Sequence, residues 1–194
     1  MAITLYNWVL FLFPLAVFLI AFLVFVKESR RVKKPLAFEF LAAAMGLFFI
    51  ARAAIDTIMQ YYAWKTGLSA YFLPPYQPIE YFIGYSIRTF WFNPIFTVVV
   101  ALAFYRILKY FERKNSRFFG EGETELGLLM AIISGWQGFL LFLPLVLLSS
   151  ILFNAIRLLI FKEKYTPIGY SFLLAGLLVL IFAGKFAGLL KLQI

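Results

Sequence analysis

Residues 124–161 decide how this chain folds, and they read TELGLLMAIISGWQGFLLFLPLVLLSSILFNAIRLLIF. The stretch is too long for one crossing of a bilayer, because a spanning helix needs about 20 apolar residues. Its length suits two crossing helices that are joined by a short turn. We therefore predict helices over residues 124–140 and 144–161, with the turn between Gly135 and Pro144.

The rest of the chain is also strongly apolar. Of its 194 residues, 64% are hydrophobic and 14% are charged, and a soluble domain of this length could not bury so much apolar surface. Uncharged runs over residues 8–26 and 168–184 approach the length of a spanning helix, and they lack the alternation of a membrane barrel. The composition predicts an all-α, polytopic transmembrane helical bundle that forms a single domain over residues 1–194.

The same pattern places the remaining helices, which are predicted over residues 5–26, 36–62, 93–110 and 168–188. Pro35 can open the second of them, because proline is tolerated in a first helical turn. Residues 65–87 contain three prolines among aromatic side chains, so they are predicted to form a loop in the headgroup layer. The expected bundle has about six helices.

Lysines and arginines gather on one side of this predicted bundle. The first, third and fifth loops and the helix ends beside them carry Lys27, Arg30, Arg31, Lys33, Lys34, Arg106, Lys109, Arg113, Lys114, Arg117, Arg157, Lys162 and Lys164. The opposite side carries only Lys65, Arg88, Lys185 and Lys191. Positive residues mark cytoplasmic loops, so we predict a multi-pass protein of a bacterial-type cytoplasmic (inner) membrane with both termini outside. The net charge of +9 is explained by these loops, and no nucleic-acid partner is expected.

Two residue types are missing from the sequence, which contains neither cysteine nor histidine. Their absence excludes disulfides, thiolate chemistry and imidazole bases, and it removes the usual ligands of zinc, haem and iron–sulfur clusters. We therefore predict no cofactor and no metal site. Any catalysis would have to use carboxylates, Arg, Lys, Tyr, hydroxyl groups or the backbone.

An acidic motif opens the long apolar stretch, where residues 120–126 read GEGETEL. Further along, residues 165–176 read YTPIGYSFLLAG. The two segments resemble the Gly-x-Gly-Asp signature and the closing Pro-Phe-Gly-Pro segment of the type 4 prepilin peptidases. The resemblance implies an intramembrane aspartyl peptidase whose acids would be Asp56 and Glu123, with a prepilin-like substrate.

Helix geometry separates these two acids, although a catalytic pair must lie at one depth to share a proton. Asp56 is about 30 Å from the start of its predicted helix, near the outer surface, whereas Glu123 lies at the cytoplasmic entrance of its helix. We interpret Glu121, Glu123 and Glu125 as solvated acids at a helix N-terminus, where the macrodipole favours negative charge.

A second resemblance covers nearly the whole chain and rests on the order of its helices and basic loops. The segments that carry it are FPLAVFLIAFLVFVKESRR, FEFLAAAMGLFFIARAAID, VVVALAFYRILKYFERKNSRFF, GLLMAIISGWQGFLLF and FNAIRLLIFKEKYTPIGYSFLLAG. They are similar to the prolipoprotein diacylglyceryl transferases, in a short and divergent form. The resemblance implies a membrane lipid, with phosphatidylglycerol as the candidate, and a lipoprotein precursor as partners. The family's Gly-Arg-x-Gly-Asn segment falls at GWQGF, residues 135–139, where Trp136 and Phe139 replace the arginine and the asparagine. The resemblance is therefore also compatible with a catalytically degenerate relative.

Arg52 is the position that this resemblance assigns to lipid binding, since a guanidinium can fork onto phosphate oxygens. Asp56 lies four residues later on the same helix face and can pair with it. An intramembrane ion pair indicates a site, although it can also serve as an interhelical clasp. Glu80 and Arg88, on the same side of the membrane, could complete a headgroup site.

A third hypothesis needs no chemistry at all. The chain could be a non-catalytic membrane scaffold or accessory subunit with a membrane protein partner. The sequence contains no series of intramembrane acids along an ion pathway, so it does not predict a pump or channel that works alone.

Overall fold

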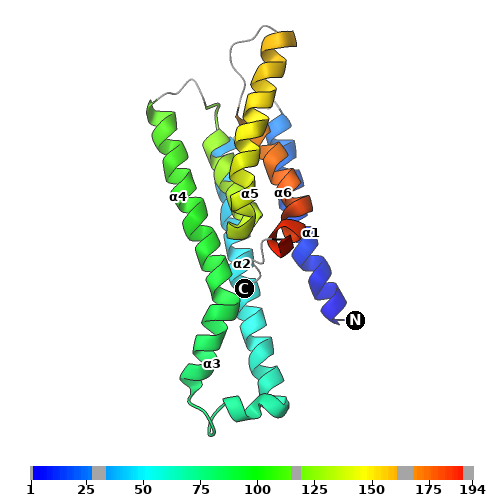
Figure 1. Ribbon diagram of the computed structural model, residues 1–194, viewed down its shortest axis with the longest axis vertical. Helices are drawn as coiled ribbons and strands as arrows, with labels where there is room; N and C mark the ends of the chain where they lie inside the picture. The colour runs from blue at the N-terminus through cyan, green and yellow to red at the C-terminus, as the bar shows by residue number, and fades with distance from the viewer. Residues whose placement is uncertain (1, 28–33, 115–118, 161–167, 190–194) are drawn as a thin grey trace.

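The computed structural model describes residues 2–27, 34–114, 119–160 and 168–189, and these residues are α-helical apart from short connections (Figure 1). The helices are α1 (Ala2–Val26), α2 (Lys34–Thr66), α3 (Ile79–Ser86), α4 (Phe92–Lys114), α5 (Glu123–Ile160) and α6 (Gly169–Leu189). A 3-10 helix, η1 (Leu68–Phe72), follows α2, and a π-helical turn, η2 (Ile87–Trp91), joins α3 to α4. The basic residues predicted for loops within 28–33, 115–118 and 161–167 lie outside the described residues.

Four helical stretches are long and apolar enough to cross a membrane, which supports the all-α class and indicates a multi-pass membrane protein. They cover Trp8–Val26, Pro35–Thr66, Ile79–Lys114 and Glu123–Leu159. A shorter apolar helix covers Gly169–Phe182. The third stretch begins well before residue 93, where the sequence predicted it to start, because α3 and η2 continue directly into α4. The predicted loop over residues 65–87 is therefore largely helical.

The backbone of α5 breaks at Gly135, which has φ 66° and ψ 164°. This region of conformational space is open almost only to glycine. The backbone N–H of Gly169 donates to Glu123, and the hydroxyl oxygen of Ser149 lies 3.4 Å from the carbonyl oxygen of Ser171. In a straight helix residues 123 and 149 would be about 39 Å apart, yet both reach the first turn of α6. The chain therefore reverses at Gly135, as Figure 1 shows.

The reversal gives α5 two limbs of different character, residues 123–134 and 136–160. Every residue from 122 to 134 is buried, and this first limb lies among α1, α2, α4 and α6. Small residues allow the close approach: a Cβ at Gly127 would lie 2.6 Å from Leu108, and one at Gly176 would lie 2.7 Å from Met130. Packing of this kind is how membrane helices associate without a hydrophobic driving force between them.

The second limb of α5 presents a largely apolar outer surface. Its exposed residues include Leu147, Leu148, Ile151, Leu158 and Leu159. Pro144, where the predicted turn could have ended, lies inside this limb. A helix with one packed side and one exposed apolar side suits lipid contact, since lipid tails are as apolar as leucine.

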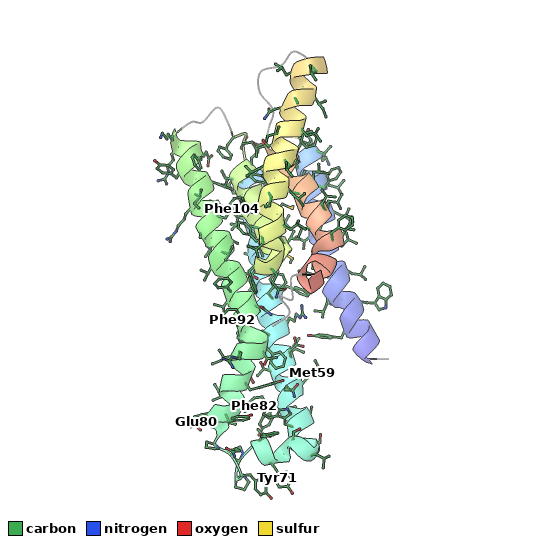
Figure 2. All side chains as sticks on the ribbon, in the orientation of Figure 1. Met59, Tyr71, Glu80, Phe82, Phe92 and Phe104 are labelled. Carbon is green, nitrogen blue, oxygen red and sulfur yellow. The ribbon has the colours of Figure 1, made fainter. Side chains whose placement is uncertain are left out.

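The C-terminal part of α2 and the helix α3 project beyond the rest of the bundle (Figure 1). The 33 residues of α2 span about 50 Å, whereas the hydrocarbon layer is about 30 Å thick. An aromatic cluster holds this projection together, with the Trp64 ring packed against those of Phe72, Tyr81, Phe82 and Tyr85. Figure 2 shows Tyr71, Glu80 and Phe82 at this end of the molecule.

Candidate functional site

A cavity of about 530 Å³ lies between α2, the junction of η2 with α4, and the Gly135 reversal of α5. We call it the Arg52 cavity. Its polar lining includes Arg52, Asp56, Thr89, Asn93 and Gln137, and its apolar walls include Phe49, Phe90 and Pro94. A mainly apolar cleft of this size with a few convergent polar groups is typical of a ligand site.

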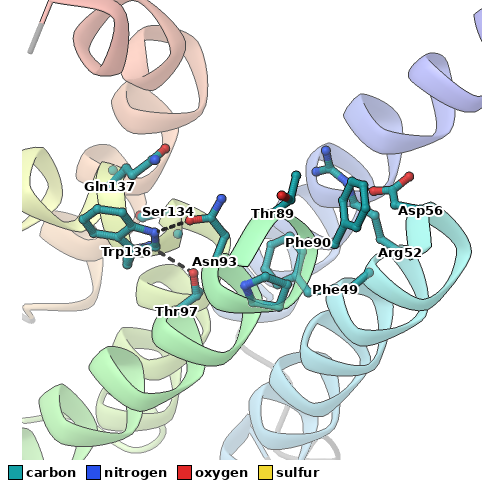
Figure 3. Close-up of a pocket in the computed structure, with 14 residues that line it drawn as sticks. Phe49, Arg52, Asp56, Thr89, Phe90, Asn93, Thr97, Ser134, Trp136 and Gln137 are labelled. Carbon is teal, nitrogen blue, oxygen red and sulfur yellow. Dashed lines mark hydrogen bonds and ion pairs between the residues drawn. The ribbon is translucent and has the colours of Figure 1, made fainter. Parts of the chain in front are cut away.

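Arg52 and Asp56 form the ion pair that their spacing on one helix predicts. Arg52 Nε lies 3.5 Å from Asp56 Oδ2, and the two side chains are 47% and 19% exposed. The hydroxyl of Tyr6 on α1 donates to Asp56 Oδ1 at 2.5 Å. The ion pair uses Nε, and Arg52 also interacts with the side chain of Tyr6. A guanidinium has five N–H donors, so donors remain for a ligand on the Arg52 side chain that Figure 3 shows beside the cavity.

Side chains of α4 hold the corner of α5 in place. The backbone N–H of Trp136 donates to Thr97 Oγ1 at 3.1 Å, and the indole N–H of Trp136 donates to Asn93 Oδ1 at 2.8 Å (Figure 3). The second bond fixes the orientation of the Asn93 amide, so its nitrogen is left as a donor. The second limb begins at this corner, and a helix N-terminus favours negative charge.

The π-helical turn η2 shapes the third wall of the cavity and places Thr89 and Phe90 on it. At the end of the turn, the Trp91 indole N–H donates to Thr57 Oγ1 at 3.1 Å, which ties η2 to α2. The Thr57 hydroxyl in turn donates to the Ala53 carbonyl at 2.7 Å. Such π-helical turns inside longer helices often occur at functional sites.

Of the residues that the sequence nominated for a headgroup site, the structure brings two together. Arg52 and Asp56 share the cavity, whereas Glu80 lies exposed on α3 and Arg88 lies exposed on η2, and neither lines the cavity. Sequence reasoning did not nominate Tyr6, Thr89 or Asn93. Asn93 is a polar residue in an otherwise apolar run, and that pattern could have indicated a site. Tyr6 gives no such indication, because tyrosines are common near the membrane interface.

Two of the three acids at the start of α5, Glu123 and Glu125, differ from their predicted solvated state. Glu123 is only 2% exposed, and its two carboxylate oxygens accept the backbone N–H groups of Gly120 at 2.8 Å and Gly169 at 2.9 Å. The interpretation of Glu123 and Glu125 as solvated acids is therefore wrong, although Glu121 is exposed. The start of α6 covers this turn, which the sequence of α5 alone could not indicate.

Glu125 belongs to a second polar group, which we call the Glu125 cluster and which comprises Tyr105, Lys109, Glu112, Thr124 and Glu125; Thr124 and Glu125 are buried, whereas the side chains of Lys109 and Glu112 are 31% and 33% exposed. Lys109 Nζ lies 2.6 Å from Glu125 Oε1 and 2.9 Å from Glu112 Oε2. The Thr124 hydroxyl is 2.9 Å from Glu125 Oε2 and 3.1 Å from Glu112 Oε2. The Tyr105 hydroxyl completes the cluster, 3.4 Å from Glu125 Oε1. Both oxygens of Glu125 are thus engaged.

The two acids of the peptidase resemblance lie near opposite ends of the first limb of α5: Glu123 is part of this limb, and Asp56 is on the neighbouring helix α2. Glu123 begins this limb, whereas Asp56 lines the cavity at Gly135, where the limb ends. Eleven residues of helix separate the two ends by about 17 Å. Two carboxylates need to be a few ångströms apart to share a proton, so this arrangement does not pair them.

Comparison of the chain with protein-family models, with curated proteins and with solved structures finds no match. The described residues nevertheless define a class: an all-α protein with four helical stretches long and apolar enough to cross a membrane, and with a polar cavity where one of its helices reverses. Its function must be argued from that cavity.

Proposed function

We propose that this protein binds the phosphate-bearing headgroup of a membrane lipid in the Arg52 cavity, with phosphatidylglycerol as the candidate. The observation that supports the proposal is the arrangement of donors around the cavity. The terminal nitrogens of Arg52, the amide of Asn93 and the N-terminus of the second α5 limb converge there. A guanidinium and a helix N-terminus are both suited to phosphate oxygens.

The proposed orientation puts the cavity toward the outer side of a bacterial-type inner membrane, with both termini outside. In α2, Arg52 lies about 26 Å from Pro35, most of the way across the hydrocarbon layer. The basic ends of α4 and α5 belong to the opposite, cytoplasmic side. Phe49, Phe90 and Pro94 line the cavity, and they suit the apolar part of a lipid next to its headgroup.

Lipid binding requires less of the cavity than diacylglyceryl transfer does. Transfer to a lipoprotein thiol needs a general base, and the carboxylate that lines the cavity, Asp56, already pairs with Arg52 and Tyr6. We therefore propose lipid binding as the function. Diacylglyceryl transfer is a more specific proposal that includes lipid binding as its first step. A lipobox peptide and phosphatidylglycerol, incubated with the purified protein, would reveal transfer as lipidation of the peptide cysteine.

Lipid binding is tested on purified protein in detergent by native mass spectrometry with added phosphatidylglycerol. Arg52→Ala is expected to raise the dissociation constant for the lipid by about tenfold or more, since charge-assisted hydrogen bonds contribute about 1.5–3 kcal/mol. The matched control is Arg88→Ala, which removes the same charge from an exposed site outside the cavity. Equal losses in both variants would mean that the lipid contacts the surface and not the cavity.

One observation favours a second candidate, a relative of the prepilin peptidases. Glu123 accepts hydrogen bonds from both Gly120 and Gly169, so it joins the two segments that carry that resemblance, of which residues 165–167 lie outside the described residues. Cleavage of a prepilin-like substrate that is abolished by both Glu123→Gln and Asp56→Asn would support it. Cysteines at positions 56 and 123 should label from opposite sides, and labelling of both from the cytoplasm would favour the peptidase.

The scaffold hypothesis remains the third proposal. It predicts that the protein co-purifies in a fixed ratio with another membrane protein and has no turnover. The lipid-binding measurement separates it from the first proposal, because a pure scaffold has no reason to lose lipid selectively in Arg52→Ala.

A further inference from the structure

Asp56 retains capacity to accept hydrogen bonds inside the Arg52 cavity. A carboxylate has about four lone-pair positions, and the structure gives Asp56 two donors, Tyr6 at 2.5 Å and Arg52 Nε at 3.5 Å. Its side chain is 19% exposed and lines the cavity. A ligand that occupies the cavity therefore meets an acceptor as well as the phosphate-binding donors.

The charges that line the cavity oppose one another. Arg52 contributes one positive charge and Asp56 one negative charge, and the other lining residues are neutral. A phosphomonoester carries a charge of about −1.5 to −2 at neutral pH, and its second negative charge would be repelled by Asp56. A phosphodiester carries one negative charge and satisfies Arg52 without this repulsion.

We infer that the Arg52 cavity selects phosphodiester headgroups that carry a hydroxyl or ammonium donor, and that Asp56 is the residue that determines this specificity. In this arrangement the phosphate accepts from Arg52 and Asn93, while the far end of the headgroup donates to Asp56. Phosphoglycerol and phosphoethanolamine have this chemistry, and phosphatidic acid does not. The inference rests on the proposed lipid-binding function and adds the class of headgroup to it.

The dimensions of the cavity agree with such a ligand. Its volume of about 530 Å³ lies within the range of about 300–1,000 Å³ that is usual for small-molecule sites. Arg52 and Asp56 are one helical turn apart, about 6 Å along α2. A headgroup can therefore reach both side chains at once, with its phosphate at one and its terminal donor at the other.

The experiment compares phosphatidylglycerol with phosphatidic acid of the same acyl chains, each added to the full-length protein in detergent and quantified by native mass spectrometry. The wild-type protein is expected to prefer phosphatidylglycerol about tenfold, which corresponds to one charge-assisted hydrogen bond. Asp56→Asn should remove this preference or reverse it. The matched control is Glu80→Gln, which removes an exposed carboxylate outside the cavity and should leave the ratio unchanged.

A second arm identifies the source of the headgroup. Glycerophosphoglycerol, a water-soluble phosphodiester with the same donors, should displace phosphatidylglycerol from the wild-type protein if the headgroup alone is recognised. If it does not, and the lipid ratio is still about tenfold, the ligand is a lipid whose acyl chains contribute to binding. Both results support the selection by Asp56.

The outcomes separate this inference from the function on which it rests. Equal or stronger binding of phosphatidic acid by the wild-type protein overturns the selection, and this measurement depends on no variant. An unchanged ratio in folded Asp56→Asn also overturns it. If Arg52→Ala still weakens both lipids, headgroup binding stands without the selection; if Arg52→Ala changes neither, both proposals fail.

Discussion

The Glu125 cluster and the Arg52 cavity are both built around an ion pair between charged side chains, but they differ in what they leave unused. Lys109 lies 2.6 Å from Glu125, whose side chain is 5% exposed and has both oxygens engaged. Arg52 lies 3.5 Å from Asp56 and is 47% exposed. A buried carboxylate with both oxygens engaged holds helices together, whereas a half-exposed guanidinium with further N–H donors can bind a ligand.

Local sequence explains part of this difference. Beside the Glu125 cluster, at the start of the same α5 limb, glycines at 120 and 169 allow backbone N–H groups to approach Glu123 closely, and a Cβ at Gly169 would lie 2.4 Å from the Phe25 ring. Around Arg52, the π-helical turn and the Gly135 reversal keep the neighbouring elements apart, and a cavity remains. Substitutions at the start of the first α5 limb should therefore lower stability, whereas substitutions in the Arg52 cavity should lower ligand binding.

The largest effect is expected at Lys109. Lys109→Met leaves the buried Glu125 without its cation; breaking a fully buried pair costs about 3–5 kcal/mol, and because the Lys109 side chain is 31% exposed we expect a loss of about 2 kcal/mol. The free energy of unfolding, measured by steric trapping in bicelles, should fall by about this amount. Lys114→Met, at the exposed end of the same helix, is the control and should change little. A small loss for Lys109→Met would show that the cluster is not a structural clamp.

A similar or smaller loss is expected at Glu123. Glu123→Gln keeps the shape of the side chain, but its amide nitrogen must then face a backbone N–H group, either that of Gly120 or that of Gly169. One unsatisfied buried donor costs about 1–3 kcal/mol, and thermal unfolding in detergent should show it. Glu121→Gln, two residues earlier and exposed, should be neutral. Equal unfolding temperatures for Glu123→Gln and Glu121→Gln would contradict the burial of Glu123.

Gly135 connects the two regions, and replacing it should affect both of them. Gly135→Ala forces a Cβ into a conformation that only glycine adopts readily, at a cost of about 1–3 kcal/mol. It should also displace Trp136 and weaken lipid binding in the cavity. Gly46→Ala is a suitable control, because a Cβ there meets no atom within 4 Å. Tryptophan fluorescence can follow the displacement, and an unchanged spectrum with normal stability would argue against the reversal.

The smallest effect on stability is expected at Arg52. The pair with Asp56 is half-exposed on the arginine side, and such pairs contribute about 0–1 kcal/mol. Arg52→Ala should therefore unfold at nearly the wild-type temperature while it loses phosphatidylglycerol. A large drop in the unfolding temperature would place this pair in the same structural class as Lys109 and Glu125.

The sequence anticipated some features of the site and missed others for identifiable reasons. The pairing of Arg52 with Asp56 follows from their spacing on one helix, so it could be predicted. The turn of the hairpin was predicted between Gly135 and Pro144, and the break occurs at Gly135 because only glycine tolerates its backbone angles. The contact of Tyr6 with Asp56 spans 50 residues, and no local pattern indicates it.

Hydropathy and helical periodicity determined, without any coordinates, that this is an all-α chain with several stretches long and apolar enough to span a membrane. They could do so because the cost of an unpaired backbone group in lipid acts on every residue separately. The tertiary structure alone decided that Glu123 and Glu125 are buried and that Arg52, Asp56 and Asn93 surround one cavity. Those facts depend on which helices lie side by side, and contacts between distant segments are not encoded in any single stretch of the chain.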